Sequence, residues 1–382
     1  LDEPKQNLEV SNGIIYVKDD KSRSLTYAKL TKGKKIVQRL TKKPAIKKSK
    51  DFKIIGKPIL STDAVSKVTG KAKYSGDVLL PDLVHAFVVR PKVYGSKKLS
   101  VDGSGIEEFK GVELLEDGDL VAVVHSDLEV AKKAAKKVQV TWEEPTEKAN
   151  NETIFKYLED NIDESKVSET GGSIEEGKNA SEIILEANYY DGYKAHAAIE
   201  THAATCYFKG DKLIVWASTQ TPFGTRGELA KAFNMPLENV QIKQIFIGGG
   251  FGGKVYSYQA VEAAKLSKLC GKPVQLVWSR REEFMYDRFR PASLLKVVSG
   301  IDKEGNLKLW NFDIYCAGTR GTKLFYDIPN NRTRMFDKRD IHPLGTGAWR
   351  APGNNTTTFA RESHIDVTAH AIGMDALEFR LN

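Results

Sequence analysis

The sequence predicts an α+β fold. A buried-type strand at 119–126, a run with helical spacing and a second strand at 138–142 follow one another in the first half of the chain. After residue 183 short strands predominate, and the clearest helix lies at 257–271. Strands and helices are mixed over the whole length, which favours an α+β arrangement, and the first compact unit alone is compatible with α+β or α/β.

The composition predicts a soluble globular protein of two or three domains. The chain has 382 residues, of which 41% are hydrophobic and 28% charged. No apolar run is long enough to predict a membrane span. The net charge is +8, but the lysines are spread widely along the chain and interleaved with acids. This pattern predicts no nucleic-acid partner. Cys206, Cys270 and Cys316 stand apart, so we expect buried, inert thiols and no iron–sulfur cluster or structural zinc within this chain.

Residues 1–50 are expected to form a leading hairpin and a linker. The segment "LEVSNGIIYV" (8–17) places two apolar runs on either side of Asn12-Gly13, a strong hairpin signal. A lysine-rich stretch at 42–53 is typical of an extended linker. No signal peptide follows Leu1, and the last residues resemble a helix that continues. We therefore expect a piece of a longer polypeptide or one chain of a divided one.

Residues 51–148 are predicted to form the first compact unit, of strand–helix–strand type. Ser126 and Glu129 have the spacing of a capping box at the start of its helix. The acidic, weakly patterned residues 149–182 predict a surface connection with one helix.

The rest of the chain is predicted as a strand-rich domain in two parts, 183–300 and 301–382. In the first part we expect a short helix at 227–233, a strand at 239–247 and the helix that ends at Gly271. No internal repeat is visible.

The loop "IFIGGGFGGKVYS" (245–257) joins a predicted strand to a predicted helix. Gly248, Gly250 and Gly253 match the dinucleotide fingerprint, while Lys254 completes most of a phosphate loop. A phosphate loop needs a Ser or Thr hydroxyl where Val255 stands, and no acid ends the next strand as a dinucleotide fold requires. A nucleotide-binding (NADP or ATP) enzyme that uses the 248–254 loop is therefore the alternative interpretation.

Two interpretations of this loop remain from the residues themselves. Glycines allow backbone N–H groups to converge on an oxyanion, a metal-oxo group or a phosphate, with Phe251 as the only side chain at the tip. The other interpretation is a tight bend where chain segments cross.

Two further loops carry polar groups in similar settings. "WASTQTPFG" (216–224) ends a strand with Gln220, which can donate and accept hydrogen bonds. "GTGAWRAPGNN" (345–355) places Trp349 and Arg350 between glycines and prolines. Without further context, Gln220 is an ordinary turn amide and Arg350 is an arginine stacked on its neighbour.

In this order the three loops resemble the molybdenum-binding large subunit of the xanthine dehydrogenase and aldehyde oxidoreductase family. The resemblance extends to 55–91, "AHAAIETHAA" (195–204), "FYDIPNNR" (325–332) and 349–382. The order of segments is similar to that of the isoquinoline 1-oxidoreductase branch.

The resemblance assigns a fold to each part of the chain. It implies an α/β hammerhead domain at 51–148 and a mixed α/β molybdopterin-binding domain at 183–300 that continues at 301–382. Residues 1–50 would then be the tail of a molybdopterin-binding domain.

The resemblance also implies roles for the residues of the three loops. Gln220 would hydrogen-bond an oxygen ligand of molybdenum. Gly249, Gly250, Phe251, Gly252 and Gly253 would cover the apical side of the metal with their backbone N–H groups, and Trp349, Arg350 and Ala351 would face the cofactor or substrate from the opposite side. Gln220, Phe251 and Arg350 are the candidate catalytic residues. No residue is expected to bind the metal directly, because the pterin dithiolene holds it.

The implied reaction is the oxidative hydroxylation of an aldehyde or an N-heterocycle by a molybdenum-bound hydroxide, with hydride transfer to a sulfido ligand. The cofactor would be molybdopterin, possibly as a dinucleotide, and electrons would pass to a separate iron–sulfur subunit. Other partners would be the remaining segments or chains of the large subunit. The bacterial cytoplasm and the periplasm are both compatible with this family.

The family's general-base glutamate and its Gly-Gln-Gly pterin-binding segment have no match in this sequence. Neither Glu200 nor Glu262 is therefore assigned as catalytic, and Glu200 is predicted to pair with His196. A non-catalytic assembly piece is a further alternative. Val255 and Pro352 differ from the acid and the aromatic residue of purine-oxidising members, which disfavours a xanthine-like substrate.

Overall fold

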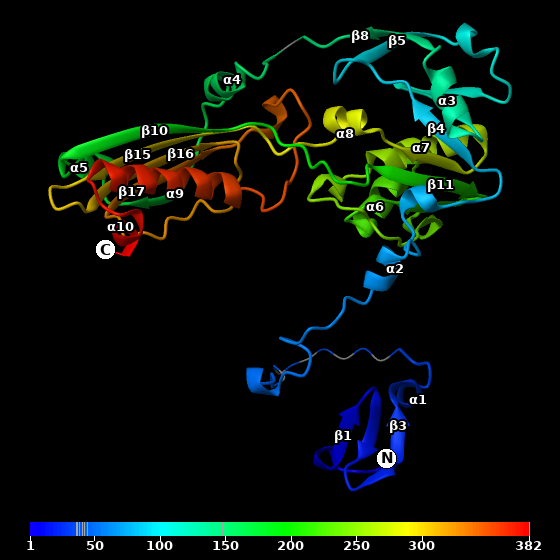
Figure 1. Ribbon diagram of the computed structural model, residues 1–382, viewed down its shortest axis with the longest axis horizontal. Helices are drawn as coiled ribbons and strands as arrows, with labels where there is room; N and C mark the ends of the chain where they lie inside the picture. The colour runs from blue at the N-terminus through cyan, green and yellow to red at the C-terminus, as the bar shows by residue number, and fades with distance from the viewer. Residues whose placement is uncertain are drawn as a thin grey trace. The chain divides into compact units, whose positions relative to one another are not determined.

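The computed structural model describes residues 1–381 except 36, 38, 40, 42, 44 and 147, and it leaves the Arg339 side chain undescribed. The chain divides into two compact units, residues 1–64 and residues 65–382 (Figure 1). Each unit is described by itself.

The first unit is a small antiparallel sheet with the order β1 (Leu8–Ser11), β2 (Ile14–Val17) and β3 (Asp20–Thr26). The predicted hairpin is confirmed, since β1 and β2 pair across Asn12 (φ 49°) and Gly13 (φ 76°). Two positive φ angles are what a tight two-residue hairpin turn requires. The predicted linker at 42–53 lies partly outside the described residues.

A seven-stranded mixed sheet is the first large element of the second unit (Figure 1). Its strand order is β13 (Val240–Ile242), β12 (Lys212–Ala217), β11 (Ala203–Lys209), β14 (Val274–Val277), β4 (Val84–Val88), β7 (Leu120–His125) and β6 (Glu113–Asp117). Figure 1 labels β4 and β11 of this sheet. Helix α7 (Tyr258–Cys270) packs on β11 and β14, and α3 (Leu128–Ala135) packs on β4 and β7. Small and branched apolar side chains fill the core between these layers. The sheet combines strands from before and after residues 149–182.

The predicted strand–helix–strand pattern forms β7, α3 and β8 (Gln139–Glu143), but β8 pairs with β5 (Lys97–Asp102) in a separate two-stranded sheet. The predicted cap was wrong by one residue. Asp127 is the N-cap of α3, and its Oδ1 accepts hydrogen bonds from the backbone N of Glu129 (2.7 Å) and Val130 (3.4 Å). An aspartate is as good a cap as Ser126, and its charge favours the helix N-terminus.

The second large element is a five-stranded sheet with the order β10 (Ile183–Asp191), β15 (Ser293–Ile301), β16 (Leu307–Tyr315), β17 (Asn330–Phe336) and β9 (Lys166–Gly171). The long helix α9 (Asn354–Ala371) packs against β10 and β15. Trp310 and Phe312 on β16 are fully buried in its core.

The connection at 149–182 was predicted with one helix, but it contains more secondary structure than that. This segment forms α4 (Ile154–Asp160), the edge strand β9 and α5 (Ile174–Asn179). Strand β9 has no buried residue in its pattern, so its place depends on backbone pairing with β17 and left no hydrophobic signal.

The remaining elements are short, apart from α6. They are η1 (Lys5–Asn7), α1 (Tyr27–Thr31), η2 (Ser49–Asp51), α2 (Ala64–Val68), η3 (Ser75–Asp77), η4 (Ser104–Ile106), α6 (Pro222–Ala232), η5 (Leu237–Asn239), η6 (Gly253–Val255), α8 (Arg280–Tyr286), η7 (Arg339–Ile341) and α10 (Ala376–Leu381). Among the helices that the structure describes, none is long and apolar enough to cross a membrane.

Burial also sets the chemistry of the three cysteines. All are free; Cys206 and Cys316 are buried as predicted, whereas Cys270 is half-buried. Burial raises the pKa of Cys206 above its usual range and that of Cys316 to about 11, so both are neutral thiols at physiological pH.

Two buried histidines make the second unit sensitive to acid. His364 on α9 is 0% exposed and hydrogen-bonds Ser299 Oγ (2.9 Å) and the Tyr189 hydroxyl (3.1 Å). Burial lowers the pKa of His364 and of His342 to about 4. The unfolded chain therefore binds more protons than the folded one between the ordinary histidine pKa and about 4.

We expect the two histidines to reduce the free energy of unfolding only below about pH 6.5. As the pH drops from there toward 4, the free energy of unfolding should fall by up to about 1.4 kcal/mol per pH unit for each histidine. Urea denaturation across this range measures the slope. His364→Gln should reduce the slope, and an unchanged slope would show that His364 does not titrate on unfolding.

Candidate functional site

The three loops singled out from the sequence meet in the second unit. The backbone N of Gln220 donates to the Lys254 carbonyl (2.7 Å), and the Gly252 N donates to Gln220 Oε1 (2.9 Å). On the other side, the Arg350 N donates to the Phe251 carbonyl (2.8 Å). Gln220, the glycine loop and the loop at 348–351 are therefore in direct contact.

The glycines of this loop make room mainly for neighbouring protein atoms. A Cβ on Gly252 would lie 2.0 Å from the Ala348 carbonyl oxygen, and one on Gly250 would lie 2.5 Å from Gln220 Oε1. A Cβ on Gly248 would approach the Cβ of Glu200 to 2.5 Å. At these three positions the glycines accommodate crossing chain segments, which agrees with the interpretation of the loop as a tight bend.

The loop nevertheless presents unused hydrogen-bond donors. The backbone N–H groups of Gly249, Gly250 and Phe251 form no hydrogen bond with any residue that the structure describes. Gly249 and Phe251 have positive φ angles of 98° and 53°. Successive free N–H groups in such a conformation form a concave site for an anionic oxygen.

Lys254 is not available to a phosphate, contrary to the phosphate-loop alternative. Lys254 is only 1% exposed, and its Nζ donates a hydrogen bond to Glu200 Oε2 (2.7 Å). The same oxygen accepts a hydrogen bond from the Gly248 N (2.7 Å). Burial lowers the pKa of Lys254, while the hydrogen bond and charge of Glu200 oppose this shift.

The predicted pairing of Glu200 with His196 was wrong. His196 Nδ1 lies 2.7 Å from Asp287 Oδ2, and its Nε2 lies 2.8 Å from the Ala348 carbonyl oxygen. The prediction assumed helical spacing between 196 and 200, but Ala197 has a φ of 49° and this segment is not helical. The two side chains consequently have different partners.

Trp349 is fixed by neighbours other than Arg350. Its Nε1 donates to the Ala195 carbonyl (3.2 Å), and the guanidinium of Arg290 lies 4.8 Å from its ring centroid. Arg290, rather than Arg350, thus makes the stacking contact that the sequence suggested. Arg350 itself is exposed, and its neighbour Ala351 has a φ of 55°.

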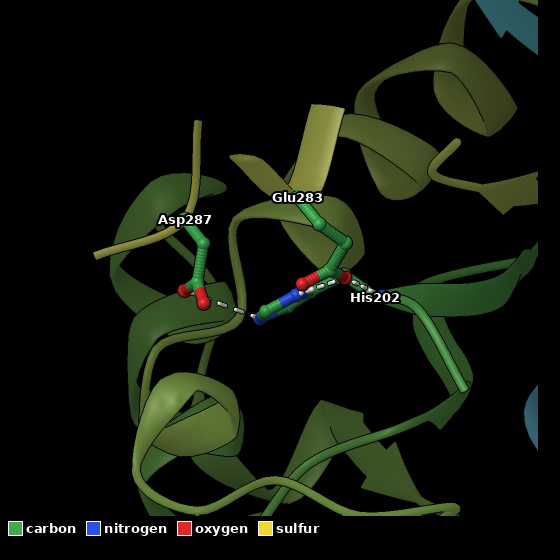
Figure 2. Close-up of side chains that lie close together, drawn as sticks. All are labelled: His202, Glu283 and Asp287. Carbon is green, nitrogen blue, oxygen red and sulfur yellow. Dashed lines mark hydrogen bonds and ion pairs between the residues drawn. The ribbon is translucent and has the colours of Figure 1, made fainter. Parts of the chain in front are cut away.

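His202, Glu283 and Asp287 form a buried cluster beside these loops (Figure 2). Glu283 Oε1 accepts hydrogen bonds from the backbone N and from Nδ1 of His202, the latter over 2.8 Å. His202 Nε2 has no partner among the described residues and lies 3.9 Å from Asp287 Oδ1. Both oxygens of Asp287 and Oε1 of Glu283 accept hydrogen bonds from protein groups, so neighbouring residues hold both carboxylates in place.

A cavity of about 320 Å³ borders the loop at 348–351. Arg290, Arg320, His342, Trp349 and Pro352 are among its lining residues. The Nε of Arg290 is buried without a partner among the described residues. The cavity thus places cationic groups and an indole ring beside the candidate site.

Sequence reasoning missed His202, Glu283 and Asp287 as parts of this site and considered Lys254 only as a phosphate ligand. The sequence contains no signal for the two acids beyond their spacing of four, and Asp287 lies just after the end of α8. Their histidine partners are 81 and 91 residues away, so no local pattern could pair them.

Comparison with known proteins decides the family. Residues 155–382 match the model of the molybdopterin cofactor-binding domain. The chain belongs to this family. Its sequence is similar over most of its length to several curated bacterial dehydrogenases.

Three of these relatives illustrate the range of the match. The chain is 25% identical to one of the nicotinate dehydrogenase subunits of Pseudomonas putida, over 99% of this chain and 34% of that protein. It is 27% identical to the nicotinate dehydrogenase large molybdopterin subunit of Eubacterium barkeri, over 87% of this chain and 89% of that protein. It is 28% identical to a probable xanthine dehydrogenase component of Bacillus subtilis, over 86% of this chain and 50% of that protein. The chain thus spans between a third and a half of the length of two of these three proteins.

Solved structures show the same fold. Quinoline 2-oxidoreductase from Pseudomonas putida matches with a TM-score of 0.72 at 20% identity, over 84% of this chain and 49% of that one. Aldehyde oxidoreductase from Desulfovibrio gigas matches with a TM-score of 0.69 at 22% identity, over 84% of this chain and 42% of that one. The α+β fold predicted from the sequence, that of a molybdenum hydroxylase large subunit, is confirmed.

Proposed function

We propose that this chain is the central part of the large subunit of a molybdenum hydroxylase, and that its three loops border the molybdenum cofactor. The observation that carries the proposal is the row of free N–H groups at Gly249, Gly250 and Phe251 beside the side chain of Gln220. The family provides the matching ligand, a cofactor whose metal carries anionic oxygen ligands. The cofactor, when bound, would supply the oxidative hydroxylation of an aldehyde or N-heterocycle.

The side chain of Gln220 and the backbone N–H groups of the glycine loop would orient the oxygen ligands of the cofactor. Gln220 uses Oε1 to hold the Gly252 N–H, so its Nε2 would donate to an oxygen of the cofactor. The N–H groups of Gly249, Gly250 and Phe251 would donate to the same region from the loop. Such neutral donors orient an oxygen without becoming metal ligands.

The loop at 348–351 would close the site from the opposite side. Arg350 is exposed and its backbone is anchored to Phe251, so its guanidinium would bind an acceptor group of the cofactor or substrate. Trp349 and Ala351 would shape the space around it. The cavity beside Trp349 would admit a small aldehyde or heterocycle.

The cofactor would be molybdopterin, with or without a nucleotide appended, and electrons would leave through a separate iron–sulfur subunit. Affinity purification of the tagged complete enzyme from its own host tests the partner. We expect an iron–sulfur protein in stoichiometric amount, and a preparation that is active without iron would contradict this part.

Metal and pterin analysis of the complete enzyme tests the cofactor. Purified from a molybdenum-sufficient host, it should contain about one molybdenum per large subunit. A preparation that turns over its substrate without molybdenum or pterin would overturn the proposal. A fully loaded preparation that changes no aldehyde or heterocycle would favour the non-catalytic assembly alternative.

Gln220→Ala should lower turnover per bound molybdenum by at least about tenfold, because one positioned partner of a metal centre commonly contributes that much. Gln244→Ala, at an exposed glutamine after β13, is the matched control and should have little effect. Steady-state kinetics of both variants, normalised to metal content, make the comparison. Equal turnover in the two variants would refute the role of Gln220.

A further inference from the structure

We propose that His196 is a positioning residue that holds the loop at 348–351 against the glycine loop by donating hydrogen bonds from both of its ring nitrogens. The proposal rests on the function proposed above, because it concerns the geometry of the same site. Nothing in the family match assigns a role to this histidine.

The partners of His196 determine its protonation. Nδ1 bonds a carboxylate oxygen of Asp287 at 2.7 Å, and Nε2 bonds the Ala348 carbonyl oxygen at 2.8 Å. Both partners can only accept, whereas a neutral imidazole donates from one nitrogen alone. The ring satisfies both contacts only as an imidazolium.

The charges around His196 favour that form. The side chain is 1% exposed, and Asp287 beside it is 3% exposed. Glu283 on α8 adds a second carboxylate that acts on His196. The buried ammonium of Lys254 is paired with Glu200 and also feels the charges of Glu283 and Asp287. Burial lowers the pKa of His196. The hydrogen bonds to Asp287 and Ala348 and the nearby negative charges raise this pKa by more than burial lowers it, so the net shift is upward.

The Ala348 carbonyl is the point where the two loops touch. It faces Gly252 so closely that an added Cβ there would lie 2.0 Å from its oxygen. Two residues later, the Arg350 N donates to the Phe251 carbonyl (2.8 Å). A histidine that fixes Ala348 therefore also fixes the direction in which Arg350 leaves the loop.

The experiment compares His196→Gln with the exposed control His370→Gln in the complete, cofactor-loaded enzyme. Glutamine offers an amide donor to one partner only and carries no charge. We expect His196→Gln to increase amide hydrogen exchange in the peptide covering 345–351 and to lower turnover per molybdenum by about tenfold or more, with a smaller change in KM. His370→Gln should match the parent enzyme in both.

Two outcomes separate this proposal from the proposed function. If the parent enzyme contains no molybdenum, the proposed function fails. If the parent is loaded and His196→Gln keeps parental exchange and turnover, the positioning role of His196 fails.

Asp287→Asn keeps the proposal testable even if His196→Gln does not fold. An amide partner no longer requires a charged ring, so the alkaline limb of the pH–rate profile should move to lower pH by about one unit or more. A limb that stays at the parental pH would overturn the assignment of an imidazolium.

Discussion

Replacing Lys254 by methionine is expected to destabilise the protein by about 3–5 kcal/mol, because it leaves buried carboxylates without their cation. The ammonium is 1% exposed and bonds Glu200 Oε2 at 2.7 Å. Asp287 and Glu283 lie close enough to act on its charge. Methionine fills a similar volume, so the loss reports the charge more than the packing. Urea denaturation of the complete enzyme gives the change in unfolding free energy.

Two companion variants isolate the cause. Lys254→Met combined with Glu200→Gln should recover much of the lost stability, since the amide still accepts the hydrogen bond from the Gly248 N without a charge. Lys265→Met removes a half-exposed lysine paired with Asp117 at 2.8 Å and should cost less than about 1 kcal/mol. Equal losses for Lys254→Met and Lys265→Met would contradict the account of a buried ion pair.

Gly252→Ala should lower turnover by about a hundredfold or more, because it forces apart the two loops that define the site. The new Cβ would meet the Ala348 carbonyl oxygen at 2.0 Å, and the φ of 115° is one that alanine rarely adopts. The chain can relieve this contact only by moving the backbone at 252 or at 348. Kinetics and molybdenum content of the purified variant measure the result.

Gly271→Ala controls for backbone strain in that experiment. Gly271 also has a positive φ, 69°, but a Cβ there would have no atom within 4 Å. It should lower stability by about 1 kcal/mol and leave turnover per molybdenum near the parental value. If both variants lose turnover equally, the close approach of Gly252 to Ala348 is not what maintains the site.

The elements with strong local signals could be predicted from the sequence. The hairpin at 8–17 follows from Asn12-Gly13, and α7 ends at Gly271 in the left-handed conformation, as its sequence indicates. The pairing partners of strands could not be predicted, even where the strand itself was, as at 138–142. β8 pairs with β5, and β9 pairs with β17, and neither pairing leaves a pattern within the strand itself.

The candidate site was predictable only as a set of loops. The resemblance of the sequence to a known family named Gln220, the glycine loop and Arg350, and the structure places them in contact. What the glycines do was misjudged, because a glycine-rich motif does not reveal which backbone approaches it. The structure shows that Gly250 and Gly252 accommodate Gln220 and Ala348, while the free donors lie on Gly249, Gly250 and Phe251.

The buried groups behind the loops were missed for a physical reason. Each ionisable residue of this cluster satisfies a partner from a distant part of the chain, such as Lys254 with Glu200 or His196 with Asp287. From the sequence, Lys254 was part of a possible phosphate loop and Glu200 was paired with His196, because the chain order does not show which distant groups meet.

The most direct test is an anomalous-scattering map of the complete, loaded enzyme, recorded at the molybdenum absorption edge. We predict a single strong peak beside the three loops, within hydrogen-bonding reach, through an oxygen ligand, of the Gln220 side chain and the free N–H groups of Gly249 to Phe251. A peak far from these groups, with protein side chains packed against the free donors, would contradict the account.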